Sequence, residues 1–236
     1  MIKEAIDRVL ELADPETFVV GDRTWRKGGY SEIEERVCEP LYFHTLTAFA
    51  DYAAGSDVPS EAIIHVTSPM EVRLFGPLTK SKKRNVYAVS GAMIDSHFPA
   101  GQWLSQDQFV TQVQTHFDDV GDRAKLLKIV GNIRGGQTAV LEDDGVTQKV
   151  TTARGVVSTQ MAEMPNPVTL SPWETFPEIA QPERQFIVRL KGGNDAPVHI
   201  ALFAVPDPRQ SLATCLAIKG WLVEALDPRL KDSVLA

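Results

Sequence analysis

The chain has 236 residues, of which 43% are hydrophobic and 23% charged, as is ordinary for a globular protein in water. Its formal net charge of −7 argues against a protein that binds nucleic acid over its whole surface, and leaves a local basic patch open. Two cysteines, Cys38 and Cys215, cannot build a disulfide framework, so we expect a reducing, cytoplasmic setting. The charged first residues do not fit a signal peptide, and no apolar run approaches the roughly 20 residues of a membrane span.

The first quarter of the chain predicts two short helices with a strand pair between them. Apolar residues at helical spacing predict an amphipathic helix over residues 2–13. Residues 17–29 fit a strand, a turn and a second strand. An acidic connector at 30–39 then leads to a helix at 46–53.

A strand at residues 62–66 is followed by a predicted hairpin, 71–75 with 86–89. The connection of this hairpin carries four cations: Lys80, Lys82, Lys83 and Arg84. Charges of one sign this close together must be solvated, so we expect an exposed loop. Such a cluster also suits phosphates or an acidic partner, and a tip that only aids solubility is the simpler interpretation.

The middle of the chain predicts a well-capped helix. Ser105 followed by Gln108 has the spacing of a capping box, and the apolar residues after it share one helical face until Gly121. Residues 125–130 fit either a helix or a strand.

The second half predicts two further hairpins and a final helix. The hairpins pair 137–142 with 146–151 around an Asp-Gly turn, and 185–190 with 198–203. A final helix at 212–226 has one apolar face, lined by Leu212, Cys215, Ile218, Leu222 and Leu226. The expected fold class is therefore α+β: one domain over residues 1–236, mostly antiparallel sheet, with N-terminal, middle and C-terminal helices.

Residues 164–190 hold five prolines separated by core-type residues. Proline stiffens the backbone, and a disordered linker would be poor in large apolar groups. We therefore predict a packed arm at 164–184 that leads into a buried strand. Trp173 and Phe176 should be largely buried in this arm, either within the subunit or against a second copy.

No residue pattern points to a catalytic or metal site. None of the five histidines has a partner at ligand spacing, so we expect neither a metal nor a cofactor. Cys215 lies on the apolar face of the last helix and should pack as a small hydrophobe, and Cys38 precedes an acidic residue that works against a reactive thiolate. The glycine-rich residues 131–136 do not match a phosphate-binding loop, and Asp143-Asp144 fits a turn.

The order of segments resembles the YfdQ-like proteins, a family of phage and prophage proteins of unknown function. The resemblance is carried by four segments: FVVGDRTWRKGG, PLYFHTLTAFADYAAG, WLSQDQFVTQVQTHFDDV and MPNPVTLSPWETFPEIAQPERQFIVRLKGG. It implies a phage-encoded protein of the host cytoplasm, and it brings no active site.

Three hypotheses follow for the function. The first is a non-enzymatic phage or prophage accessory protein that acts by protein–protein contacts and self-associates. The second is a nucleic-acid-associated factor in phage replication or recombination that uses the Lys80–Arg84 loop. The third is a small enzyme whose site is assembled from dispersed residues; a polar pocket with converging histidines or carboxylates would favour it.

Overall fold

The computed structural model describes residues 39–55, 57–80, 82–133, 166–192 and 197–236 with their side chains, together with Lys3 and the strand residues given below. Strands β1 (Thr17–Val20), β2 (Arg23–Arg26) and β3 (Ser31–Glu32) form an antiparallel sheet. This confirms the predicted strand pair. The predicted helix at 2–13 lies outside the described residues, apart from Lys3.

A second small sheet flanks residues 144–147, where the Asp-Gly turn was predicted and which lie outside the described residues. It contains β9 (Ala139–Asp143), β10 (Gln148–Arg154) and β11 (Ser158–Glu163), all antiparallel. The hairpin of β9 and β10 was predicted, and β11 was not.

The five-stranded body is the first of two larger units. Its strands are β4 (Leu41–Phe43), β5 (Ile63–Ser68), β6 (Glu71–Leu78), β7 (Arg84–Gly91) and β15 (Val234–Leu235), in the order β15-β5-β6-β7-β4. The hairpin of β6 and β7 is antiparallel, as predicted, whereas β4 and β15 pair in parallel with their neighbours. Parallel pairs need long connections, so adjacent sequence did not reveal them. Helices α2 (Leu46–Ala53), α5 (Gln210–Ala225) and α6 (Pro228–Lys231) complete this body.

The four-stranded body is the second unit. Its strands are β8 (Leu104–Ser105), β12 (Val168–Leu170), β13 (Arg184–Gly193) and β14 (Ala196–Ala204), antiparallel in the order β12-β13-β14-β8. Helices α3 (Gln106–His116) and α4 (Arg123–Asn132) pack on one face of this sheet. Ser105 and Gln108 form the predicted capping box. Residues 125–130 are helical because their apolar positions at helical spacing are buried against the sheet.

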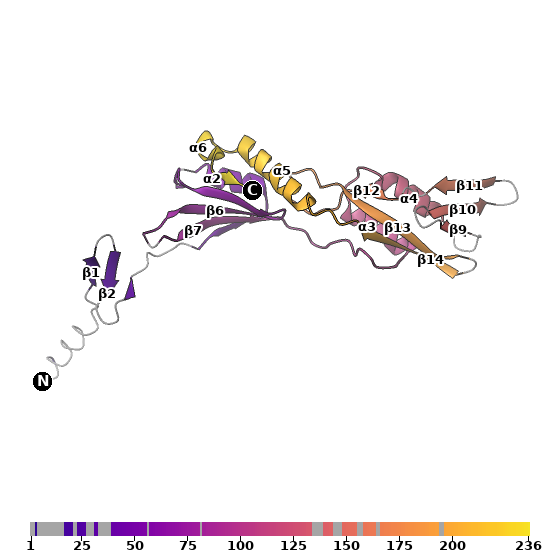
Figure 1. Cartoon of the computed structure of the whole chain (residues 1–236), viewed down its shortest axis with the longest axis horizontal. Helices are drawn as coiled ribbons and strands as arrows, with labels where there is room; N and C mark the ends of the chain where they lie inside the picture. Colours follow the sequence, from indigo (N-terminus) through magenta and orange to yellow (C-terminus); the bar gives the residue numbers. More distant parts are fainter. Residues whose placement is uncertain are drawn as a thin grey trace.

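Each body has its own hydrophobic cluster, and the two lie end to end (Figure 1). The chain builds most of the five-stranded body, crosses to the four-stranded body, and returns through α5 to the first. The α+β class is confirmed. That both clusters fold as one domain stays a prediction.

Helix α5 confirms the C-terminal prediction with one correction. Cys215, Ile218 and Leu222 are buried in the five-stranded body, as expected for one apolar face. Leu212 was placed on the same face, but it is 56% exposed, because the first turn of α5 extends past the sheet-facing cluster. Within the described residues, no helix is both long enough and apolar enough to cross a membrane.

Candidate functional site

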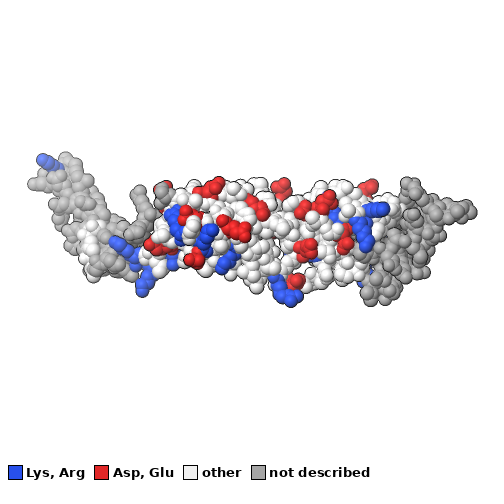
Figure 2. Space-filling view, turned by 90° about the horizontal axis from the view of Figure 1, so that it is seen from above, with Lys and Arg blue, Asp and Glu red and all other residues white. Residues whose placement is uncertain are grey.

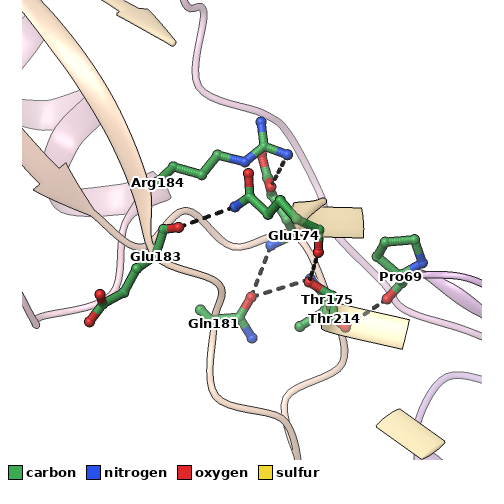
Figure 3. A network of polar contacts seen from close by, with 8 residues as sticks. Pro69, Glu174, Thr175, Gln181, Glu183, Arg184 and Thr214 are labelled. Carbon is green, nitrogen blue, oxygen red and sulfur yellow. Dashed lines mark hydrogen bonds and ion pairs between the residues drawn. The ribbon is translucent and has the colours of Figure 1, made fainter. Parts of the chain in front are cut away.

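The described part of the predicted arm, residues 166–184, joins the two bodies, and a buried glutamine, Gln181, shapes it (Figure 3). The Oε1 atom of Gln181 accepts hydrogen bonds from the backbone N–H groups of Glu174 and Thr175, at 2.9 and 3.2 Å. Its Nε2 donates to the carbonyl oxygens of Phe176 and Ile179, both at 3.2 Å. Prolines leave this segment with few ladder hydrogen bonds, and the Gln181 side chain bonds four of its backbone groups; of these, the Phe176 carbonyl also accepts the N–H of Ile179 at 3.1 Å.

Hydrogen bonds fasten the arm to the five-stranded body. The Thr175 hydroxyl donates to the carbonyl oxygen of Pro69 at 2.6 Å. Both the backbone N–H and the hydroxyl of Thr47 donate to Glu178, at 2.9 and 3.0 Å. Phe176 is fully buried in the cluster of this body, which confirms that part of the prediction.

The other end of the arm belongs to the four-stranded body. The backbone N–H of Trp173 donates to the carbonyl oxygen of His116, the last residue of α3, at 3.0 Å. The N–H of Asp118 donates to Ser171 at 2.8 Å, and β12 places Val168 and Leu170 in the second cluster. The arm therefore contributes side chains to both cores.

One ion pair lies at the junction. Arg184 at the start of β13 contacts Glu174 at 2.7 Å (Figure 3). Burial raises the pKa of the Glu174 carboxyl, and the charges of Arg184 and His97 oppose that shift.

Trp173 differs from its prediction, because it is 41% exposed within the chain. It borders two cavities, of about 380 Å³ and about 110 Å³. Ser96, His116 and Trp173 line both of them. Burial within the subunit is therefore wrong for Trp173, and its contact with a second copy stays a prediction.

The outward face of the four-stranded sheet is a second candidate surface. Alternate residues of β13, namely Phe186, Val188 and Leu190, are buried against α3 and α4, so Ile187 and Lys191 point to the opposite side. Register pairs Ile187 with Phe203, Arg189 with Ala201 and Lys191 with His199. Ile187 and Phe203 are 36% and 38% exposed, whereas Ala201, the next outward residue of β14, is fully buried, so this outward face, the open face, is only partly exposed to solvent.

Trp103 completes the open face from the edge strand. It immediately precedes β8, is 38% exposed, and its ring lies 6.3 Å from that of Phe203. Gly101, at φ +80°, turns the chain there and donates its N–H to Leu202 of β14 at 2.7 Å. The ammonium of Lys191 lies 4.4 Å from the centre of the Trp103 ring, a cation–π geometry.

The described outward positions of these four strands include cations but no carboxylate. They are Ser105, Thr169, Gln185, Ile187, Arg189, Lys191, Pro197, His199, Ala201 and Phe203. Elsewhere, acidic and basic side chains are interspersed on the face that Figure 2 shows, so no large field of one sign covers it. The open face thus combines aromatic rings with a local positive charge in an acidic chain.

The predicted basic loop is exposed but lies elsewhere. Lys80, Lys82, Lys83 and Arg84 are all exposed at the tip of the β6–β7 hairpin, which points away from the four-stranded body (Figure 1). The guanidinium of Arg84 donates a hydrogen bond to the carbonyl oxygen of Gly76 at 2.8 Å, so this cation is bound to its own hairpin. The structure does not bring this loop to the open face.

The remaining sequence candidates contribute no site. Burial raises the pKa of the Cys215 thiol, which disfavours the thiolate. Cys38, residues 134–136 and Asp144 lie outside the described residues. Among the residues that are described, no group of three or more His, Cys, Asp or Glu could hold a metal ion.

Sequence reasoning missed Trp103, Phe203 and Lys191. The alternation of Ile187, Arg189 and Lys191 with buried residues was visible in the sequence, but the strand was interpreted as wholly buried. No family model, no curated protein and no solved structure matches the chain.

Proposed function

We propose that the open face of the four-stranded body binds single-stranded nucleic acid. The observation that carries this proposal is the arrangement of Lys191, Trp103 and Phe203, all partly exposed, on one sheet face. Proteins that bind single strands combine exposed aromatic rings, on which bases stack, with cations that contact the backbone phosphates.

The geometry suits single strands better than a duplex. Trp103 and Phe203 are both partly exposed, so their rings offer surfaces on which unpaired bases can stack. The bases of a duplex are already stacked on one another and do not present their faces. Each stacked base contributes about 1–3 kcal/mol, and the contact tolerates any sequence.

The charges support the same assignment. Lys191 lies on an outward position of β13 with its ammonium over the Trp103 ring, and no carboxylate lies on the described outward positions of this sheet. Phosphate binding by such a cation releases counterions, so it weakens as salt rises. The net charge of −7 works against phosphate binding over the rest of the chain, so we expect nucleic acid to bind at this face.

The test is a fluorescence-anisotropy titration of a labelled oligothymidine with the full chain at several salt concentrations. We expect saturable binding whose log–log salt slope is about −0.7 for each phosphate contacted. The matched duplex should bind more weakly. Absence of binding at low salt, or equal binding of single and double strands, would contradict the proposal.

We also propose where and when the protein acts. The resemblance to YfdQ-like proteins supports a phage or prophage protein that acts in the host cytoplasm during replication or recombination. An accessory role through protein contacts and self-association is the second candidate, because the arm presents the exposed Trp173 beside a cavity. Sedimentation equilibrium measures it: a dimeric mass that Trp173→Ala reduces would support it, and a monomeric mass would exclude it.

A further inference from the structure

A serine and a histidine meet at the junction between the two bodies. The Oγ atom of Ser96 lies 2.8 Å from Nε2 of His116. The other ring nitrogen of His116, Nδ1, lies 3.0 Å from the carbonyl oxygen of Gln112 and 2.8 Å from the hydroxyl of Thr115. A carbonyl oxygen can only accept, so Nδ1 carries the proton. In the neutral ring Nε2 then accepts the hydrogen bond from Ser96.

This is the order of groups that activates a nucleophile: a hydroxyl, a base, and a group that orients the base. Gln112 and His116 are one turn apart on α3, so the helix itself fixes the tautomer of the ring. Ser96 comes from the segment that crosses from β7 to β8, so the pair is assembled from separate parts of the chain.

Space for a substrate lies on both sides of Ser96. The larger cavity, about 380 Å³, and the smaller one, about 110 Å³, both include Ser96 and His116 in their walls. Trp173 lines both cavities, and its backbone N–H donates to the carbonyl oxygen of His116. A role as a cavity wall explains why this large ring is not buried in either core.

The walls indicate the chemical class of the substrate. Met93, Ile94 and Pro177 give the larger cavity apolar surface beside Trp173. Asp95 lines the larger cavity, whose described walls hold no Lys or Arg, so an anion is disfavoured there, whereas Glu174 in the smaller cavity is balanced by Arg184. A small, uncharged ester fits the larger cavity better than a phosphate ester does. Neither cavity is lined by Trp103, Lys191 or Phe203, so this site is separate from the proposed nucleic-acid face.

We infer that Ser96 is a nucleophile and His116 its general base in the cleavage of small, uncharged carboxylic esters. Ser96 Oγ bonds to the acyl carbon while its proton moves to Nε2 of His116. The ester C–O bond then breaks, and the leaving group departs as an alcohol with that proton. A water molecule, deprotonated by the same nitrogen, cleaves the acyl-serine and restores Ser96.

The first experiment treats the folded full chain with a fluorophosphonate probe and locates the label by peptide mass mapping. We expect one labelled residue, Ser96. Ser96→Ala should abolish the label, and His116→Gln should slow labelling by about 100-fold, as expected for loss of a general base. Ser60→Ala, which changes an exposed serine remote from the cavities in sequence, should label like the parent chain.

The second experiment measures hydrolysis of p-nitrophenyl acetate by the same variants, with thermal midpoints recorded to confirm folding. Turnover should depend on both Ser96 and His116, and Trp173→Phe should change KM more than kcat. Labelling of Ser96 that is no faster than in urea-unfolded protein, or that is unaffected in His116→Gln, would overturn the inference. Oligothymidine binding should be unchanged in Ser96→Ala, so failure here is distinct from failure of the nucleic-acid proposal.

Discussion

The two bodies share one architecture and differ in the outward face of the sheet. In each, helices cover one side, and residues on the other side, such as Tyr42 and Phe203, are at least partly exposed. On the five-stranded sheet the outward Arg73 is paired with Glu71 at 2.7 Å. On the four-stranded sheet the outward Lys191 instead lies over Trp103.

The difference shows that outward strand positions, rather than the fold, decide what each sheet can bind. The hydrogen bond from Arg73 lowers the pKa of Glu71, which keeps the carboxylate ionised beside the cation. A neutralised pair offers little attraction to phosphate. Tyr42 on the same sheet is 72% exposed. The cation in its row is Arg73, because both residues pair with Val89, and Arg73 already has Glu71 as its partner.

The largest expected effect is on stability, and it compares a core residue of the five-stranded body with a residue at the junction. Phe176 is fully buried, so Phe176→Ala should lower the free energy of unfolding by about 3–5 kcal/mol. The sequence alone predicts a loss of about 3 kcal/mol or more for Trp173→Ala; its 41% exposure reduces our expectation to about 1–2 kcal/mol. Urea denaturation of both variants measures this. Equal losses would show that the arm does not distinguish a core residue from a cavity wall.

The next effect concerns affinity. Trp103→Ala should weaken oligothymidine binding by about 1–3 kcal/mol, because it removes one stacking surface and the ring under Lys191. Tyr42→Ala removes an even more exposed ring from the other sheet and should leave binding unchanged. Anisotropy titrations compare the two. A larger loss of affinity in Tyr42→Ala would place the binding site on the five-stranded body and contradict our proposal.

A smaller effect should follow from charge reversal. Lys191→Glu should weaken binding about tenfold and make the salt slope shallower by about 0.7, since one phosphate contact is lost. Lys82→Glu, in the exposed basic loop, is the matched control. If the control changes the slope and Lys191→Glu does not, the loop is the nucleic-acid site.

The smallest effect tests neutralisation on the five-stranded sheet. Glu71→Gln removes the partner carboxylate of Arg73 and should raise oligothymidine affinity by about twofold or less, because surface ion pairs are weak and Tyr42, the exposed ring in the same register row, lies two strands away from Arg73. A gain above tenfold in the same titration would mean that charge alone, without stacking, governs binding.

Local patterns predicted most of the secondary structure. The hairpins, the capping box at Ser105 and the burial of Phe176 each depend on neighbouring residues or on one large apolar group. The parallel pairs and the open face depend on contacts distant in sequence. Trp103 meets Phe203 only because β8 lies beside β14, and no local pattern encodes that pairing.

The same reasoning explains why the residues that stand out in the sequence are not those of the proposed sites. Lys80, Lys82 and Lys83 cluster in the sequence, but a hairpin tip holds them away from the aromatic rings. Ser96 and His116 have no recognisable spacing, and the crossing segment brings them together against α3. Spacing identifies sites built on one element and misses those assembled between elements.

The most direct test of the central claim is photo-cross-linking of an oligonucleotide that carries 5-iodouracil, followed by peptide mass mapping. Such a base cross-links to the aromatic side chain on which it stacks. Our account predicts cross-links at Trp103 and Phe203 and none at Tyr42. Cross-links confined to Tyr42 or to peptides of the 79–84 loop would contradict it.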